Sequence, residues 1–169
     1  LSAADGSLAQ TLADVQTLRS EGFTLDTIDV SGATQVSSLS INDAQAVELV
    51  SAELHFAAAD HITVEAAAGT HLHTSLRELQ KLGVDAVNAA GSTLDIDLGW
   101  EINGNGSLSG MPNLGGDGVD VTLHGNYWNL PAFLMNAGPD SSSLKDLGVD
   151  HIRYAYDTSS GNYMSLSDY

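Results

Sequence analysis

Residues 75–87 carry the signals for a helix start, a helix, a helix stop and a strand start in one short stretch, Ser-Leu-Arg-Glu-Leu-Gln-Lys-Leu-Gly-Val-Asp-Ala-Val. Ser75 and Glu78 fit a capping box, in which a hydroxyl and a carboxylate each bind an otherwise unpaired N–H group at the helix start. Leucines follow at helical spacing, and Gly83 suits the left-handed residue that ends many helices. The stretch therefore predicts a short helix followed by a strand over Val84–Val87.

Partial copies of this pattern occur elsewhere in the chain. Further capping boxes begin at Thr11, Ser40 and Ser143. The tripeptide Gly-Val-Asp recurs at 83–85, 118–120 and 148–150. Helix-then-strand units that repeat about every 30–35 residues are typical of proteins in which each unit packs against its neighbours. We therefore expect a degenerate repeat protein of the mixed α/β class.

The middle of the chain has a different pattern. Apolar and polar residues alternate strictly around 93–99 and again around 119–125, which predicts two half-buried strands. The segment between them is rich in Gly, Asn and Ser, so no obvious helix joins the two strands and we expect them to pair antiparallel. The length suits a single domain over 1–169. It would combine a helix–strand repeat part (1–92) with a strand- and loop-rich part (93–169) that has a partly antiparallel sheet and ends in one further helix–strand unit.

The charge balance excludes several classes of partner. The chain has 5 Lys and Arg against 22 Asp and Glu, a formal net charge of −17. Such a surface repels nucleic acid and anionic lipid, which bind clustered cations. It attracts cations, Ca²⁺ above all, because carboxylate oxygens are the preferred ligands of Ca²⁺; the alternative is that the charge serves solubility alone.

Other absences in the sequence narrow the possibilities further. Without cysteine there are no disulfides, thiolate metal sites or thiol nucleophiles. No apolar run approaches the roughly 20 residues that cross a bilayer, so we expect no membrane insertion. The chain begins at Leu1 and shows no signal peptide, and we therefore expect a processed product or part of a longer chain.

Two sets of side chains are candidate metal ligands. His71 and His73 lie on one face of an extended segment, a spacing that suits Zn²⁺ if His55, His61, His124 or His151 converges with them, although they also fit histidines of a surface loop. Asp95 and Asp97 share a strand face, with Glu101 in phase beyond them, and could hold Ca²⁺ or act as paired carboxylates. The alternative is that they form the exposed polar face of a half-buried strand.

Most aromatic residues lie in the C-terminal part of the chain. These candidates for a ligand or partner surface are Trp100, Tyr127, Trp128, Tyr154, Tyr156 and Tyr163. Together with nearby asparagines they could stack on sugars and hydrogen-bond them. They fit equally an assembly interface, where Trp and Tyr are enriched, or the core.

Catalytic motifs are missing from the sequence. No serine lies in Gly-x-Ser-x-Gly, and no glycine-rich phosphate loop with a lysine occurs. We therefore expect no enzymatic activity and name no catalytic residue. A metal-dependent hydrolase that uses the histidines and aspartates above is the remaining enzymatic alternative.

Leu39-Ser-Ile-Asn-Asp-Ala-Gln-Ala-Val, Leu54-His-Phe-Ala-Ala-Ala-Asp-His-Ile-Thr-Val and the helix–strand stretch over 76–87 resemble degenerate repeats of large secreted proteins of Gram-negative α-proteobacteria. These are acidic, cysteine-free, adhesin-like or matrix proteins, often grouped with RTX-type type I secretion substrates. The resemblance covers roughly 10–99 and 143–156, and it implies an extracellular, non-enzymatic building block. Gly115-Gly-Asp-Gly-Val-Asp also resembles one Ca²⁺-binding nonapeptide of RTX repeats, which makes Asp117 and Asp120 candidate ligands. It occurs once, so we do not expect a β-roll, which needs stacked copies.

These observations lead to one functional prediction and two alternatives. We expect a non-enzymatic structural or adhesive module of a bacterial extracellular or cell-surface assembly that acts by self-association or tethering, with Ca²⁺ as the candidate ion. Its partners would be copies of itself or a larger parent chain, and not nucleic acid. The alternatives are a carbohydrate-binding, lectin-like module whose partners are glycans, and the metal-dependent hydrolase.

Overall fold

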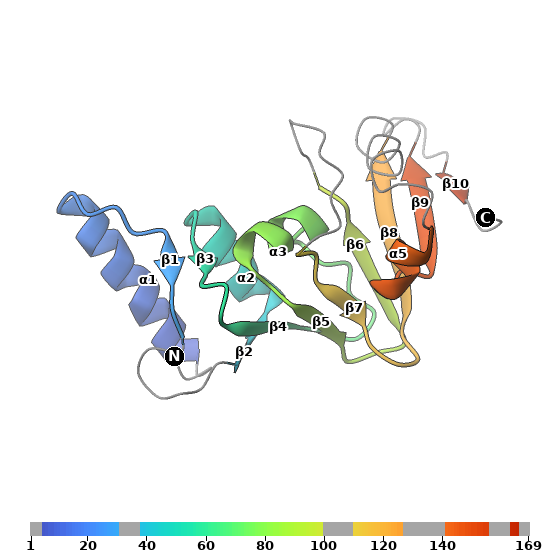
Figure 1. The fold of residues 1–169 in the computed structure, drawn as a ribbon, viewed down its shortest axis with the longest axis horizontal. Coiled ribbons are helices and arrows are strands. Elements are labelled where there is room, and N and C mark those ends of the chain that lie inside the picture. The colour runs from blue at the N-terminus through green and yellow to red at the C-terminus, as the bar shows by residue number, and fades with distance from the viewer. Residues whose placement is uncertain (1–4, 31–37, 100–109, 127–140, 156–162, 166–169) are drawn as a thin grey trace.

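Helices and strands follow one another through the described parts of the chain (Figure 1). The structure, a computed structural model, describes residues 5–30, 38–99, 110–126, 141–155 and 163–165. Its helices are α1 (Asp5–Ser20), α2 (Asp43–Ser51), α3 (Leu76–Leu82) and α5 (Ser141–Asp146). Its strands are β1 (Thr27–Ile28), β2 (Ser38–Asn42), β3 (His55–Phe56), β4 (His61–Ala66), β5 (Ala86–Ala89), β6 (Thr93–Asp97), β7 (Asn113–Gly115), β8 (Asp120–Asn126), β9 (His151–Ala155) and β10 (Tyr163–Ser165).

The strands form two four-stranded sheets and one short pair. The first sheet has the order β2-β4-β5-β7, the second has the order β10-β9-β8-β6, and β1 pairs with β3. Every pairing is parallel except that of β9 with β10. The predicted mixed α/β class is confirmed.

Each unit of the chain passes through the sheets in the same direction. After α3 the chain forms β5 in the first sheet, turns a short corner and forms β6 in the second sheet; β7 and β8 repeat this route. We call each pass of the chain through the sheets a level. Level 1 holds β2, and level 2 holds β4 and the segment 70–74. Level 3 holds β5 and β6, level 4 holds β7 and β8, and level 5 holds β9. Helices α2 and α3 lie side by side over the first sheet (Figure 1).

The spacing between levels is shorter than the repeat length that the sequence predicted. Ser38 pairs with His61, and Thr93 pairs with Asp120. Thr122 pairs with His151. The partners in each of these pairs are closer along the chain than one predicted repeat. The capping boxes from which the longer period was predicted do not all mark helix starts, which explains the difference.

The expected antiparallel pairing of the strands around 93–99 and 119–125 is wrong. Strands β6 and β8 pair in parallel over Thr93–Asp97. Between them the chain adds β7 to the first sheet, alongside β5, before it returns to the second sheet. Parallel neighbours need a connection that brings the chain back to the same end of the sheet, and β7 lies on this connection.

The capping box at Ser75 is confirmed. The Ser75 hydroxyl accepts the N–H of Glu78 at 3.3 Å, and the Glu78 carboxylate accepts the N–H of Ser75 at 2.8 Å. Gly83 ends the helix in the left-handed conformation, with φ of 84°. This short helix therefore has the start and the end that the sequence predicted.

The other three boxes do not start helices. Ser40 lies within β2, and the true cap of α2 is Asn42, which forms a capping box with Gln45. Thr11 lies inside α1, which begins at Asp5. Ser143 likewise lies inside α5, which begins at Ser141.

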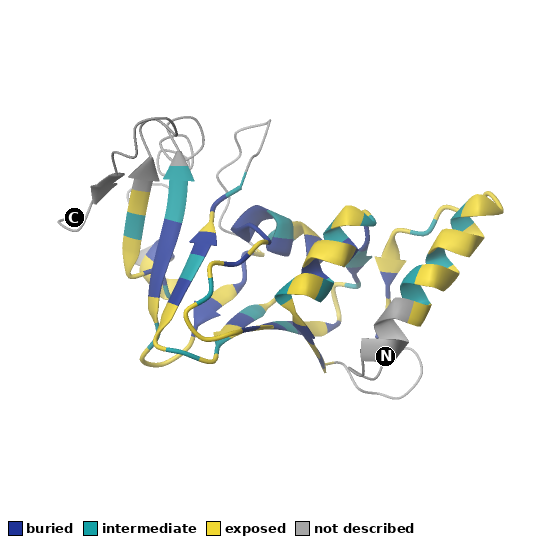
Figure 2. Ribbon diagram, turned by 180° about the vertical axis from the view of Figure 1, so that it is seen from behind, coloured by how far each residue is buried: buried dark blue, intermediate teal, exposed yellow. Residues whose placement is uncertain are grey.

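The core lies between the helices and the two sheets (Figure 2). The helices contribute leucines, and the strands contribute the alternate residues that face inward. The largest fully buried side chains are Leu49, Ile62, Leu76, Leu79, Leu82, Leu94, Ile96, Leu98, Leu123, Val30 and Val64. They run through successive levels as one cluster, so the levels share a single apolar interior.

Helix α1 is exposed over most of its described length and lies at one end of the molecule (Figure 2). Arg19, one of the few cations, fixes its C-terminal end. Its guanidinium donates to the carbonyl oxygen of Leu25 at 2.9 Å and to that of Ala52 at 2.6 Å. Among the described helices, none is long and apolar enough to cross a membrane.

Candidate functional site

The second sheet has one apolar face and one polar face. On β6, Leu94 and Ile96 are buried, whereas Asp95 and Asp97 point the other way. The parallel register places Asp95 beside Thr122 and Asp97 beside His124 on β8. Because side chains at paired positions share a face, acidic and imidazole groups from neighbouring levels meet there.

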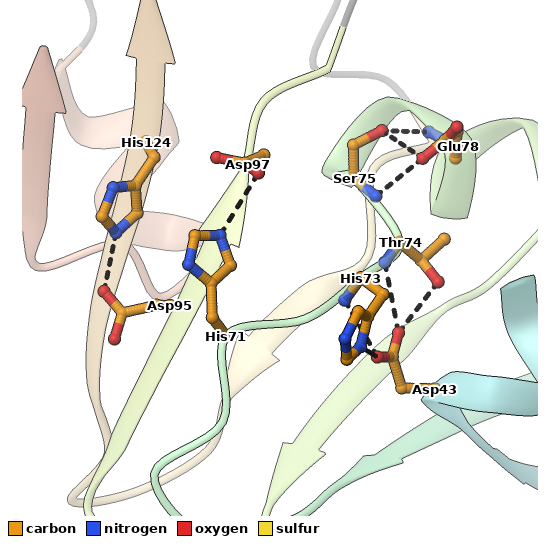
Figure 3. Close-up of polar contacts among 9 residues, drawn as sticks. All are labelled: Asp43, His71, His73, Thr74, Ser75, Glu78, Asp95, Asp97 and His124. Carbon is orange, nitrogen blue, oxygen red and sulfur yellow. Dashed lines mark hydrogen bonds and ion pairs between the residues drawn. The ribbon is translucent and has the colours of Figure 1, made fainter. Parts of the chain in front are cut away.

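Two imidazole–carboxylate contacts form the centre of this polar face (Figure 3). Nε2 of His124 lies 2.7 Å from Oδ1 of Asp95, and Nε2 of His71 lies 3.2 Å from Oδ2 of Asp97. The two imidazole rings stack, with centroids 4.9 Å apart and an interplanar angle of 28°. His71 reaches this position because its backbone bridges Asp95 at the edge of the sheet.

A third contact lies on the same face towards β9. Nε2 of His151 is 3.1 Å from Oδ1 of Asp120. The register also places Arg153, an exposed residue, beside His124. We call the group His71, Asp95, Asp97, Asp120, His124 and His151 the histidine–aspartate face. Its most enclosed member is His124, whose side chain is 17% exposed, whereas that of Asp95 is 35% exposed.

A separate carboxylate, Asp43, joins the start of α2 to the segment before α3 (Figure 3). Its Oδ2 accepts the N–H of His73 at 2.9 Å and lies 2.8 Å from Nδ1 of that ring. Its Oδ1 accepts the N–H of Thr74 at 3.2 Å and the Thr74 hydroxyl at 2.9 Å. Burial raises the pKa of Asp43, but the hydrogen bonds from His73 and Thr74 outweigh burial and hold that pKa below the usual 3.8.

Other aspartates bind the backbone of the preceding strand. Oδ2 of Asp85 accepts the N–H of Ile62 at 2.7 Å, and Oδ2 of Asp150 accepts the N–H of Val121 at 3.0 Å. Both aspartates end a Gly-Val-Asp tripeptide that follows a helix. Part of the strong negative charge therefore links one level to the next through hydrogen bonds.

The structure brings together only some of the predicted metal ligands. His71, Asp95 and Asp97 meet, but the His73 ring contacts Asp43 and Asp120 contacts His151. Asp117 is exposed in the turn between β7 and β8. Glu101 lies outside the described residues.

A metal site is not apparent in this arrangement. Within the ranges that the structure describes, no group of three or more histidine, aspartate or glutamate side chains could hold a metal ion. We therefore identify none of these residues as a metal ligand, and Ca²⁺ binding stays a prediction from the sequence.

The predicted aromatic surface falls mostly outside the described residues. This applies to Trp100, Tyr127, Trp128 and Tyr156. Tyr154 and Tyr163 belong to the neighbouring strands β9 and β10, where Tyr154 pairs with Met164 and Tyr163 pairs with Ala155. Sugar binding by these aromatic side chains therefore also stays a prediction.

Among the residues of the imidazole–carboxylate contacts described above, His124 and His151 were predicted only as histidines that could join His71 and His73, and Asp43 was not predicted as a site residue. The alternation of Asp120, Thr122 and His124 with apolar residues was visible in the sequence. If the two strands had been predicted to pair in parallel, this alternation would have placed His124 beside Asp97. Asp43 gave no comparable signal, because an acidic residue at the start of a helix is common for reasons of capping alone.

Comparisons with known proteins assign no family to this chain. No family model, curated protein or solved structure matches this chain. The chemistry available from the described arrangement is thus the formation of hydrogen bonds and ion pairs between imidazoles and carboxylates of adjacent levels.

Proposed function

We propose that this chain is a non-enzymatic structural or adhesive module of a bacterial extracellular or cell-surface assembly, and that it acts by self-association or tethering. The observation that carries the proposal is the stacking of successive levels in parallel, with each first-sheet strand beside that of the next level. In such architectures the ends of the stack can accept further strands, because edge strands carry unpaired backbone groups.

Strand β2 is the edge that best supports self-association. It is the terminal strand in the order β2-β4-β5-β7. Its sequence Ser-Leu-Ser-Ile-Asn contains no charge and no proline, the residues that commonly protect edges from pairing. Its inward residues Leu39 and Ile41 are buried, so a strand added alongside would extend the same apolar face.

The net charge of −17 sets the conditions under which association is expected. Copies of the chain repel each other at low ionic strength, and salt screens this repulsion. Sedimentation velocity across protein concentrations, at low and at about 0.5 M salt and with and without Ca²⁺, tests the proposal. We expect the sedimentation coefficient to rise with concentration, and more so in salt or Ca²⁺.

A variant with an added charge on β2 tests whether this edge forms the contact between copies of the chain. Ser40 is an exposed residue of β2, and Ser40→Lys places a charge on the proposed edge. Ser92→Lys adds the same charge at an exposed corner between β5 and β6 and serves as the matched control. We expect weaker association for Ser40→Lys only. A protein that is monomeric under every condition would refute self-association.

A further inference from the structure

The two ends of the stack present different edges of the sheets. At the first end, β2 is the outer strand of the first sheet, and within the described residues only β4 pairs with it. At the other end, the first sheet stops at β7, where the N–H of Leu114 donates to the carbonyl oxygen of Leu147 at 2.7 Å. The second sheet ends there in β10, a strand of 3 residues that runs antiparallel to β9. In the described part of the chain, the far end therefore offers the 5 residues of β2 no parallel strand of matching length.

We propose that two copies of the chain pair through β2, antiparallel and around a two-fold axis, so that self-association closes at a dimer. This inference rests on the proposed function and specifies its contact. Because β4 occupies the inner edge of β2, the β2 strands of two copies meet through the same outer edge. A contact between identical edges is isologous, and it leaves neither edge free to add a third copy.

The burial pattern of β2 determines the direction of this pairing. Leu39 and Ile41 face the apolar interior, whereas Ser38, Ser40 and Asn42 are exposed. A two-fold axis perpendicular to the sheet makes the strands antiparallel and keeps the inner residues of both copies on the same side. A parallel pairing through the same edge would turn the second copy over and place its inner residues on the polar side. Only the antiparallel arrangement extends the apolar face across the contact.

The same burial pattern determines the register. With Ser40 opposite Ser40 of the second copy, Leu39 lies opposite Ile41 and Ser38 lies opposite Asn42, so all residues of both strands are paired. A shift of one residue would place inner residues opposite outer ones and destroy the shared apolar face. A shift of two residues would keep the faces but leave part of each strand without its partner. The register centred on Ser40 is therefore the one that pairs the whole of β2.

The charges near β2 allow two acidic copies to approach at this strand. Strand β2 itself carries no charge, and the carboxylate of Asp43, the next residue, is bound by His73 and Thr74. On β4, Glu65 lies beside Asn42 in the register. The β4 strands of the two copies would be three strand spacings apart, about 14 Å, which exceeds the screening length of about 8 Å at physiological salt. Repulsion between the two Glu65 carboxylates is therefore weak.

Single cysteines test the register, because the chain contains no cysteine of its own. In Ser40→Cys the two thiols lie opposite each other across the axis. Paired residues of antiparallel strands have Cα atoms about 4.5–5.5 Å apart, within the range of about 4.4–6.8 Å that a disulfide spans. Ser38→Cys, on the same strand and face, is the matched control. Its two thiols would be displaced by about 13 Å along the strands, too far for a disulfide.

The rate of disulfide formation in a glutathione redox buffer with about 0.5 M salt is the measurement. We expect Ser40→Cys to form linked dimers at least about tenfold faster than Ser38→Cys, because pairing raises the local concentration of its two thiols. Ser92→Cys, at the exposed corner between β5 and β6, should be as slow as Ser38→Cys. In sedimentation velocity, the original protein should reach a limiting species of twice the mass of one chain.

The outcomes separate this inference from the proposed function on which it rests. Growth of the original protein beyond a dimer would show that copies add head to tail, and it would overturn the closed pairing while self-association stands. Equal rates of disulfide formation for Ser40→Cys and Ser38→Cys would also overturn the pairing centred on Ser40. A protein that stays monomeric at every concentration and salt would refute the dimer and self-association together.

Discussion

Replacing Asp43 removes the acceptor that joins the start of α2 to the segment before α3. Its Oδ1 takes two hydrogen bonds from Thr74, a residue only 1% exposed, and its Oδ2 takes two from His73, whose side chain is 81% exposed. In Asp43→Ala the buried N–H and hydroxyl of Thr74 lose their acceptor. Water can replace the lost partner only at His73.

The size of the effect follows from this difference. A buried donor left without an acceptor costs about 1–3 kcal/mol, and a hydroxyl that can rotate costs less than a fixed N–H. Loss of a negative charge at the start of a helix adds about 0.3–1 kcal/mol. We therefore expect Asp43→Ala to lower the free energy of unfolding by about 2–4 kcal/mol. Asp43→Asn, which can keep the Oδ1 contacts with Thr74, should lower it by about 1 kcal/mol.

Urea denaturation followed by circular dichroism measures both variants against the original protein. Asp117→Ala, at an exposed turn position, is the control and should change the free energy of unfolding by no more than about 0.5 kcal/mol. Equal losses for the alanine and asparagine variants would refute the reasoning, because they would show that the Oδ1 contacts with Thr74 contribute nothing.

The contribution of Asp43 to stability depends on pH in the acid range. The pKa of this carboxyl is lower in the folded chain than its usual 3.8, so its contribution is complete well above that value and is lost as the pH falls through the folded pKa. The difference in stability between the original protein and Asp43→Asn should therefore shrink in strong acid. A difference that is constant down to about pH 2 would contradict this assignment.

Two further substitutions test the backbone geometry. Gly148→Ala should destabilise the protein by about 2–4 kcal/mol, because φ is 89° and a Cβ would collide with the carbonyl oxygen of Leu114. Gly118→Ala, with φ of 81° and open space around the residue, should cost only about 1–2 kcal/mol. Equal losses of stability in urea denaturation would contradict the close packing at Gly148. Ser75→Ala removes the capping hydroxyl of α3 and should lower the free energy of unfolding by about 1 kcal/mol. Glu78→Ala should have a similar effect, because it removes the other half of the capping box. Unchanged stability in both variants would argue against the capping box.

Local signals allowed part of the fold to be predicted. The cap, leucine spacing and glycine of the 75–87 stretch give a helix and a strand close to the predicted positions. The same signals failed at Ser40, where a competing cap residue, Asn42, starts the helix instead. They failed again at Gly118, where a tripeptide that elsewhere follows a helix forms a corner between β7 and β8. The Gly-Val-Asp tripeptide has the same local preference wherever it occurs, and only the elements that pack around it decide whether it ends a helix or forms a corner between strands.

The candidate site was predicted less completely than the fold. The sequence placed Asp95 and Asp97 on one strand face and identified His71 as a candidate ligand, and these three residues do meet in the structure. It did not pair Asp95 or Asp97 with His124, because the partner of a strand residue depends on a register set by segments far away in the chain. The expectation of an antiparallel sheet would have placed other residues opposite Asp97.

The sequence by itself determined the alternation of apolar and polar residues in β6 and β8, the capped helix α3 and the shortage of cations that leaves carboxylates to be paired by histidines. These properties depend on neighbours along the chain or on composition. Only the tertiary structure decided that β6 and β8 run parallel and that the imidazole of His124 meets the carboxylate of Asp95 on the adjacent level. A single strand has nearly the same pattern in either orientation, and the route through β7 that makes the parallel pairing possible lies between the two strands.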